Sequence, residues 1–317
     1  MAQANANFDR VASTTLKNYA RQLADNVSDH IPLLKLMRLK GAVKLRGGDS
    51  IVLPVLSEFA NAQSYSGSDT IDITKQDGIS AAEYNWKQTV CPVVIEGIEK
   101  ARNMGPDRVI DLMDALFMQS ELSIEDKVSE MIFGDGTGNS GKDMLGLQAI
   151  VDDDPTTGTL GGINRATNSF WRNVTNTSGG SWSGGAAENA VSTAIRDVQR
   201  GSDMPNIIVT DSTNFGRMQT LANGRAQYLN PKLAEFNFQA LKFQGIDVIF
   251  DQNCPADHLY ILNTKYLKLY VHQDVNFATT PFVEPSNQDI LVAKIKLYAQ
   301  LATSRAESAA VLSGFSA

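Results

Sequence analysis

The chain has 317 residues, enough for about two domains, and its 43% hydrophobic and 20% charged residues are ordinary for a globular protein. A formal net charge of −7 argues against a protein that is basic throughout, although it leaves a local basic patch open. The two distant cysteines form no disulfide framework, and neither a signal peptide nor an apolar run of about 20 residues is visible. We therefore expect a soluble protein made in a cytoplasm.

The N-terminal region begins with apolar side chains near helical spacing over residues 8–28. Pro32 interrupts this pattern, and a short apolar segment follows. Within and after that segment lie five basic residues with no acidic residue between them: Lys35, Arg38, Lys40, Lys44 and Arg46. A solvated face explains such a run, and so does contact with an acidic neighbour or with nucleic acid.

Two strand-like segments flank a polar stretch in the next part of the chain. Ser50–Leu56 has the pattern of a strand, and alternating residues from Tyr84 to Ile95 predict a returning strand. Residues 57–80 between them are polar and rich in turn-forming residues. The pattern predicts an extended hairpin whose tip is too poor in apolar residues to form a compact domain. We expect this hairpin to lie across another copy of the chain, contacting it through Tyr65, Tyr84 and Trp86.

The clearest element is a long amphipathic helix from Pro106 to Phe133. Its apolar side chains recur at intervals of three and four residues, as one buried face of a helix requires. Pro106 suits the first helical position, and Gly134 suits the position just after the last turn. A helix of this length would span about 40 Å, well above the average, and we expect it to pack along a sheet.

Helical and strand patterns alternate after a loop-rich region at residues 134–184. Residues 186–200 and 212–221 have helical patterns. The strand patterns cover residues 207–209, 246–250, 259–262, 267–271 and 290–300. This alternation predicts a compact α/β domain and an apolar strand near the C-terminus.

The segment from Gly134 to Lys142 matches part of a phosphate-binding motif, because Gly136, Gly141 and Lys142 have its glycine and lysine spacing. Asp143 stands where that motif needs Ser or Thr, and its carboxylate would face phosphate oxygens. The segment also follows a long helix, whereas a phosphate-binding loop follows a strand and opens a helix. We therefore predict a glycine-rich turn, and keep a nucleotide-binding enzyme that uses Gly136–Lys142 as an alternative.

Candidates for metal binding and catalysis are few. The aspartates at 152–154 are adjacent, so their side chains point in different directions, as in a solvated turn. The three histidines, His30, His258 and His272, are isolated from one another, and no zinc-protease or serine-hydrolase motif occurs. Cys254 and His258 share a turn, but their spacing does not make a catalytic pair. We predict no metal, no cofactor and no enzymatic activity.

The order of these parts resembles the major capsid proteins of tailed phages, which share an α+β architecture called the Johnson fold. Three stretches carry the resemblance: DNVSDHIPLLKLMRLKGAVKLRGGDSIVLPV (25–55), FGDGTGNSGKDMLGLQAIV (133–151) and PNIIVTDSTNFGRMQTL (205–221). A helix end followed by Gly-Asp-Gly and then Gly-Leu is typical of that family's passage from spine helix to outer domain. The resemblance implies a basic N-terminal arm, an extended β-hairpin loop, a peripheral domain with a long spine helix, and an axial α/β domain.

The resemblance also implies domain limits, a function and partners. The implied domains are the arm at 1–45, the extended loop at 46–104, the peripheral domain at 105–140 with 275–305, and the axial domain at 141–274 with 306–317. We expect the arm and the extended loop to find their burial on other copies and not on their own chain. The implied function is to assemble into pentamers and hexamers that form an icosahedral head around double-stranded DNA, within a virion built in the bacterial host cytoplasm. Implied partners are further copies, a portal, decoration proteins, a separate scaffolding protein or none, and packaged DNA through non-specific contacts, without a membrane. An encapsulin-type protein compartment of the same fold is the second alternative.

Overall fold

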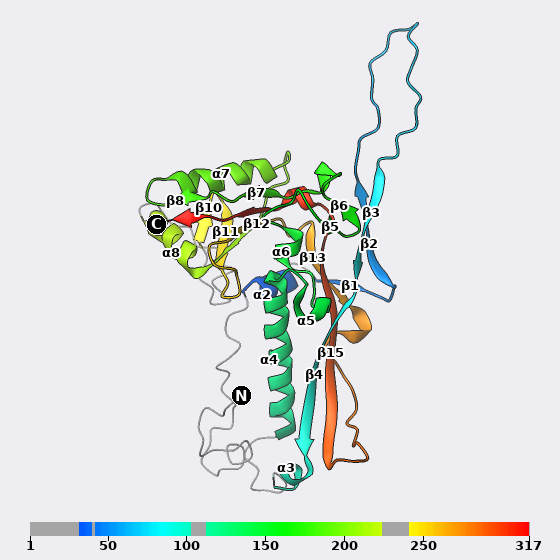
Figure 1. Cartoon of the computed structure of the whole chain (residues 1–317), viewed down its shortest axis with the longest axis vertical. Helices are drawn as coiled ribbons and strands as arrows, with labels where there is room; N and C mark the ends of the chain where they lie inside the picture. The colour runs from blue at the N-terminus through cyan, green and yellow to red at the C-terminus, as the bar shows by residue number, and fades with distance from the viewer. Residues whose placement is uncertain (1–31, 40–41, 103–111, 224–240, 317) are drawn as a thin grey trace.

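The computed structural model of the chain describes residues 32–39, 42–102, 112–223 and 241–316. The molecule is elongated: a long helix and two long strands run side by side along it, and a six-stranded sheet with two helices lies at one end (Figure 1). A β-hairpin projects from the same end, on the opposite side. The mixture of helices and sheets confirms the predicted α+β class. Lys40, the helical pattern at 8–28 and the predicted helix start at Pro106 lie outside the described residues.

The long helix is α4 (Leu112–Phe133), whose 22 residues span about 33 Å at the usual rise per residue. Its apolar face is buried as predicted, with Ile124, Val128 and Ile132 each at most 1% exposed. The helix ends at Phe133, directly before Gly134, as the sequence indicates.

The sheet along α4 is built on β15 (Ile290–Thr303) and β4 (Lys87–Glu96), which pair antiparallel over ten residues. It continues from β15 through β13 (Leu267–His272) to the parallel strand β1 (Val43–Leu45), and β14 (Ala278–Thr279) also pairs with β15. The prediction that residues 93–95 continue the hairpin's returning strand is wrong, because they lie in β4 and pair with β15.

The hairpin itself consists of β2 (Ser50–Leu56) and β3 (Ile79–Asn85). One face of this ribbon, with Ile51, Val55, Ala82 and Tyr84, is buried in the chain's own core. We expected the whole segment 46–104 to find its burial on other copies, and for the base of the hairpin and for β4 this is wrong. Alternating apolar residues give each of these strands an apolar face that the chain's own core already covers.

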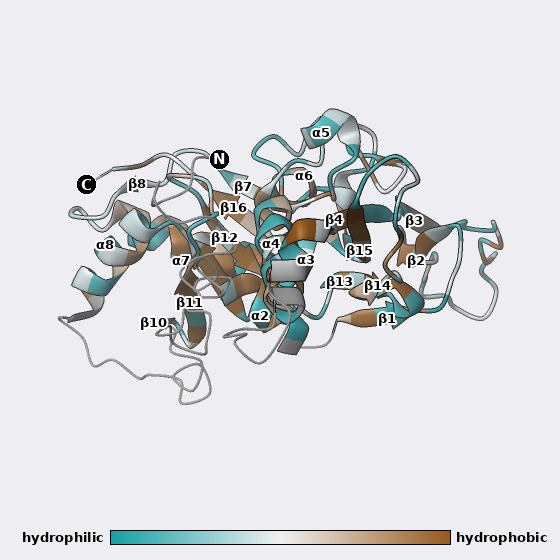
Figure 2. Ribbon diagram, turned by 90° about the horizontal axis from the view of Figure 1, so that it is seen from below, coloured by the Kyte–Doolittle hydropathy of each residue, from teal (hydrophilic) through white to brown (hydrophobic). Residues whose placement is uncertain are grey.

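The six-stranded sheet has the order β10, β11, β9, β12, β16, β7 and carries most of the predicted α/β region. Its strands are β10 (Leu241–Phe243), β11 (Ile246–Phe250), β9 (Ile207–Thr210), β12 (Leu259–Leu262), β16 (Ala310–Leu312) and β7 (Val174–Asn176). The helices α7 (Ala186–Val198) and α8 (Ser212–Asn223) cover one face, and α4 lies toward the other. In β9, Ile208 packs into the core under α7, while Ile207 and Val209 pack into the core that reaches α4. Figure 2 shows these hydrophobic strands between the helices.

A short helix, α2 (Pro32–Leu39), packs between α4 and the sheets, and Leu33, Leu34, Leu36 and Met37 are all buried there. This part of the predicted arm, which we also expected to be buried on other copies, belongs to the chain's own core instead. The remaining elements are short: α3 (Gly97–Arg102), α5 (Gly138–Gly141), α6 (Leu147–Ile150), β5 (Thr159–Leu160), β6 (Ile163–Asn164), β8 (Gly180–Ser181), β17 (Phe315–Ser316), and 3-10 turns at Ser169–Trp171, Gln273–Val275 and Ala306–Ser308.

Candidate functional site

The end of the hairpin, which we call the hairpin tip (residues 57–78), is the most exposed part of the described chain. Every residue from 58 to 77 is exposed, and the tip projects away from the body of the molecule (Figure 1). Its large apolar side chains include Phe59, 88% exposed, and Ile73, 91% exposed. The tip also carries four acidic residues against one basic residue: Glu58, Asp69, Asp72, Asp77 and Lys75. It therefore offers an acidic and partly apolar surface that nothing in the described chain covers.

Side chains, rather than a backbone ladder, give the hairpin tip its shape. Asn61 Nδ2 donates to Asp72 Oδ2 at 2.9 Å and so links the outgoing and returning segments of the tip. Thr74 donates to Asp72 Oδ1 through both its backbone N and its hydroxyl. At the far end, Ser66 N donates to Asp69 Oδ2 at 2.8 Å. The hydrogen bonds from the Thr74 side chain and backbone lower the pKa of Asp72, so its carboxylate stays charged at neutral pH.

A basic groove lies on the solvent face of β4 and β15, and we call it the lysine groove. It has a volume of about 690 Å³ and is lined by Trp86, Lys87, Gln88, Thr89, Val90, Pro92, Gly141, Lys142, Lys294, Lys296 and Tyr298. Four of these lining residues are lysines and none is acidic, in a chain with a net charge of −7. Exposed apolar area lies among the lysines, because Val90 is 56% exposed.

The register of the long strands explains how this groove arises. Lys296 pairs with Val90 and Lys294 with Pro92, so these side chains share one face of the ribbon. The intervening Ile295 and Leu297 point to the opposite face and are buried. At the start of β4, Lys87 Nζ donates to the carbonyl oxygen of Gly141 at 2.5 Å, which ties the α5 loop to the rim of the groove.

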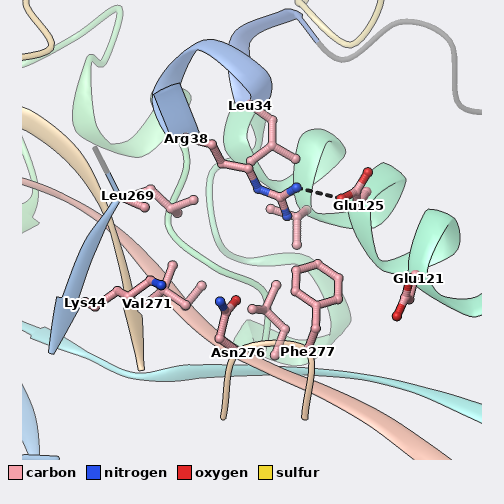
Figure 3. Close-up of a pocket in the computed structure, with 13 residues that line it drawn as sticks. Leu34, Arg38, Lys44, Glu121, Glu125, Leu269, Val271, Asn276 and Phe277 are labelled. Carbon is pink, nitrogen blue, oxygen red and sulfur yellow. Dashed lines mark hydrogen bonds and ion pairs between the residues drawn. The ribbon is translucent and has the colours of Figure 1, made fainter. Parts of the chain in front are cut away.

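A second pocket, of about 580 Å³, lies on the α4 side of the same sheet (Figure 3). Arg38 of α2 and Lys44 of β1 face it, and Glu121 and Glu125 of α4 lie across from them. Arg38 Nη1 contacts Glu125 Oε1 at 2.6 Å, and the Arg38 guanidinium lies over the ring of Phe277. The charges in this pocket are balanced, which contrasts with the purely basic lysine groove.

No family model matches the sequence, and no curated protein matches it. Comparison of the structure with solved structures does find relatives that cover nearly the whole chain. The capsid of cyanophage A-1(L) is 16% identical, with a TM-score of 0.71, over 94% of this chain and 96% of that one. The capsid of a native GTA particle is 11% identical, with a TM-score of 0.68, over 99% and 100%. The holo-SrpI encapsulin of Synechococcus elongatus is 10% identical, with a TM-score of 0.58, over 93% and 92%.

The chain has the phage capsid fold. An encapsulin shell shares this fold, and identities of 10–16% explain why only the structure finds these relatives. No helix in the described part of the chain is both long enough and apolar enough to cross a membrane.

The capsid fold separates the predicted contact residues into different environments. Lys35, Arg38, Lys44 and Arg46 are all exposed, but Arg38 is paired with Glu125, and Arg46 Nε donates to Gln273 Oε1 at 2.8 Å. They lie along α2, β1 and the turn after it, and do not join the lysine groove. A contact of these residues with another molecule stays a prediction.

The three predicted aromatic contacts differ from one another. Tyr65 is 68% exposed on the hairpin tip, where a neighbour could reach it. Trp86 is partly buried beside the lysine groove and donates from Nε1 to the carbonyl oxygen of Gly48. Tyr84 is 1% exposed and packs in the chain's own core, so its side chain is not available to a second copy as we expected. The sequence did not indicate the lysines of the groove, because Lys87, Lys142 and Lys294 come from three distant segments.

The capsid fold also gives a local account of the glycine-rich segment. Residues 134–142 follow the C-terminus of α4, where the partial negative charge of the helix disfavours phosphate. Asp135 is engaged within the turn, because its carboxylate accepts hydrogen bonds from the backbone N and hydroxyl of Thr137. Gly146 lies against the helix end, where a Cβ atom would come within 2.3 Å of the Met131 carbonyl oxygen.

The remaining candidates for chemistry are engaged in structural contacts. Among the described residues, no group of three or more His, Cys, Asp or Glu side chains could hold a metal ion. Cys254 Sγ faces the carbonyl oxygen of His258 at 3.8 Å instead of its ring, and burial raises the pKa of this thiol well above its usual value. Cys254 therefore stays protonated and is not a nucleophile paired with His258.

Proposed function

We propose that the chain is a shell subunit that assembles with copies of itself, and that the hairpin tip of one copy lies in the lysine groove of a neighbour. The likeness to capsid and encapsulin structures over more than nine-tenths of the chain carries the first part. The second part follows from two surfaces of one chain that complement each other. The tip is acidic with exposed apolar side chains, and the groove is basic with exposed apolar side chains.

The hairpin tip does not reach the lysine groove of its own chain, because the hairpin projects away from β4 and β15 (Figure 1). Contact between different patches of two copies is heterologous, and repeated contacts of that kind form a ring when the rotation from one copy to the next closes. Slightly different angles of the same contact would then give the pentamers and hexamers of an icosahedral shell.

Magnitudes show what each part of this contact contributes. A single exposed ion pair is worth about 0.2–1 kcal/mol, so the lysines mainly select and orient the partner. Burying Phe59 or Ile73 on a neighbour would contribute about 1.5–3 kcal/mol each. Each copy makes such a contact with its neighbour in a ring, so weak contacts add up to a stable shell.

In this proposal the shell is a virion head that holds double-stranded DNA and is built in the cytoplasm of a bacterial host, and the chain catalyses no reaction. A portal, decoration proteins and a scaffolding protein are the further partners. The encapsulin-type alternative has the same fold but encloses protein cargo. The TM-scores do not separate the two, because mycobacterium phage structures at 0.57 and the encapsulin at 0.58 score alike, and the resemblance of the sequence to tailed-phage capsid proteins favours the head.

Electron microscopy of the purified full-length chain, expressed alone and with its scaffolding protein if one exists, tests the shell. We expect regular closed particles, and soluble monomers under all these conditions would contradict the shell function. Nuclease-protected DNA in native particles separates the head from the compartment, which would contain a protein instead.

Three variants test the contact between tip and groove. Replacing residues 59–77 by an Asn-Gly turn keeps the β2–β3 ladder, and we expect it to abolish particles while leaving a folded subunit. Lys294→Glu should weaken assembly strongly, whereas Arg196→Glu, the same charge change at an exposed site on α7, should not. Adding Glu58→Lys and Asp77→Lys to the Lys294→Glu variant should restore particles. Normal particles from Lys294→Glu, together with no effect of tip removal, would overturn the contact but leave the shell function standing.

A further inference from the structure

The turn between β11 and β12, residues 251–258, joins separate parts of the molecule through its side chains. Asp251 Oδ2 accepts a hydrogen bond from Leu33 N at the start of α2, at 3.3 Å. Asn253 Nδ2 donates to Ser129 Oγ of α4 at 3.0 Å. The turn is therefore a joint between the six-stranded sheet and the helices that lie along the other sheet.

The end of this turn carries two more links. The carboxylate of Asp257 accepts hydrogen bonds from Gly314 N and Phe315 N, both at 2.9 Å, and holds the last described strand. His258 Nε2 lies 3.0 Å from Asp153 Oδ2, in the loop after α6. The His258 side chain is 22% exposed and that of Asp153 is 45% exposed, so water and protons reach the pair.

The contacts of His258 fix its protonation state. Its Nδ1 lies 2.8 Å from the carbonyl oxygen of Ala256, while Nε2 faces the Asp153 carboxylate. A carbonyl oxygen and a carboxylate oxygen only accept hydrogen bonds, and a neutral imidazole has a single N–H to donate. Only a ring that carries both protons, and thus a positive charge, makes both hydrogen bonds.

We propose that His258 and Asp153 form a proton-operated clamp between the loop at residues 151–158 and the turn at residues 251–258. The clamp is closed while the imidazole carries two protons. When the ring loses one proton, one of its two nitrogens faces an acceptor without a hydrogen to donate, and the link between loop and turn is weakened because the positive charge opposite the Asp153 carboxylate is lost. This device belongs to the subunit itself and does not rest on the proposed shell function.

The groups around the ring favour the charged form. Asp153 and Asp257 are the nearest carboxylates, and the neighbouring Asp152 is offset by Arg165, whose Nη1 lies 3.5 Å from it. The ring of Tyr260 stacks on the imidazole at 6.0 Å between centroids and adds no charge at neutral pH, because burial raises the pKa of its phenol. Cys254 likewise stays a neutral thiol.

The pKa of His258 follows this balance. Burial by itself lowers the pKa, but the hydrogen bonds to Ala256 and Asp153 and the charge of Asp153 outweigh it and raise the pKa above the usual value. The pKa of His258 is higher in the folded state than in the unfolded state. The clamp therefore stabilises the fold fully at pH values below the pKa of the unfolded state, which is about 6.5. The stability that the clamp contributes is lost as the pH rises through the pKa of His258 in the folded state.

A double-mutant cycle with His258→Gln and Asp153→Asn, followed by thermal unfolding of the full chain, tests the clamp. We expect the two changes to be coupled by about 2 °C in Tm at pH 5.5 and clearly less at pH 8.5, where only a neutral hydrogen bond can remain. The control is His272→Gln, because His272 Nδ1 accepts a hydrogen bond from Asp274 N and does not need a second proton. We expect the control to show no coupling to Asp153 at either pH.

Nitrogen-15 NMR of the imidazole measures the protonation of His258 directly, and a variant is needed only to assign its signal. Solution NMR suits isolated subunits, and solid-state NMR suits particles. We expect both His258 nitrogens to be protonated at pH 6. A neutral ring at that pH, or a coupling to Asp153 that is the same at pH 5.5 and 8.5, would overturn the clamp.

Discussion

The hydroxyl of Tyr84 donates a hydrogen bond to the carbonyl oxygen of Thr303 at 3.0 Å, and thereby fastens the root of the hairpin to the end of β15. These residues are 219 positions apart in the chain. Tyr84 is 1% exposed, and burial raises the pKa of its phenol, so the group remains a donor throughout the neutral range. This hydrogen bond is a buried anchor between the root of the hairpin and the sheet along α4.

Tyr84→Phe should therefore destabilise the chain although it keeps the aromatic ring. The loss of one buried hydrogen bond, with the Thr303 carbonyl oxygen left behind, costs about 1–2 kcal/mol of the free energy of unfolding. Urea denaturation of the full chain measures this change. Tyr65→Phe is the matched control, because Tyr65 is 68% exposed on the hairpin tip and its change should cost nothing measurable. Equal stabilities of the two variants would show that the anchor is unimportant.

Gly146→Ala should be far more damaging than its size suggests. A Cβ atom at this position would lie 2.3 Å from the Met131 carbonyl oxygen, 2.4 Å from that of Gly134 and 2.6 Å from that of Ile132. These are backbone atoms at the end of α4, so the overlap is relieved only by moving the helix, at a cost of about 3 kcal/mol. Gly67→Ala on the hairpin tip is the control, since no atom lies within 4 Å of its Cβ position. Thermal unfolding should show a lower Tm for Gly146→Ala alone.

Local patterns in the sequence predicted the elements better than their partners. The end of α4 at Phe133 and the strand at residues 246–250 lie where periodicity and turn residues placed them. Residues 93–95 were assigned to the hairpin because an alternating apolar run looks the same beside any partner. Pairing between β4 and β15 joins residues about 200 positions apart, and the local sequence holds no record of it.

The candidate site shows the same limit. Alternation indicated that Tyr84 shares a face with other apolar residues, but not whether that face meets the chain's own core or a neighbour. Exposure of the hairpin tip could be foreseen, because its composition is polar and rich in turns. The lysine groove could not, since Lys142 and Lys294 meet only after the long strands have paired and the α5 loop has folded over their end.

The full chain should not bind ATP, despite its glycine-rich segment. In the described structure, Lys142 lines the lysine groove on a loop at the carbonyl end of α4, and Asp135 and Asp143 lie in the same turn. Calorimetric titration with millimolar ATP and magnesium should give no saturable heat, and Lys142→Ala should leave that result unchanged. Saturable binding that disappears in Lys142→Ala would instead support the nucleotide-binding alternative.

The stability of Asp251→Asn relative to the natural chain should depend on pH with a definite sign. Asp251 is 1% exposed, and burial raises the pKa of its carboxyl although Asn253 N and Leu33 N donate hydrogen bonds to it. A carboxyl whose pKa is higher in the folded state stabilises the fold at pH values below its unfolded-state pKa of about 3.9. That stabilisation is lost as the pH rises through the pKa of the folded state. Replacing it by an amide removes this loss, so the variant should gain stability relative to the natural chain between pH 4 and pH 7.5.

Asp72→Asn should show the opposite trend and is the control for the buried carboxyl. Asp72 is exposed, and hydrogen bonds from the Thr74 side chain and backbone lower the pKa of its carboxyl. The ionised form of Asp72 therefore stabilises the folded hairpin tip. As the pH rises, the free energy of unfolding of the natural chain should increase relative to that of the variant. Urea unfolding of both variants and the natural chain at pH 4, 5.5 and 7.5 measures the two differences. If both stability differences changed with pH in the same direction, burial would not raise the pKa of Asp251. The hydrogen bond from Leu33 N would then already compensate the buried charge.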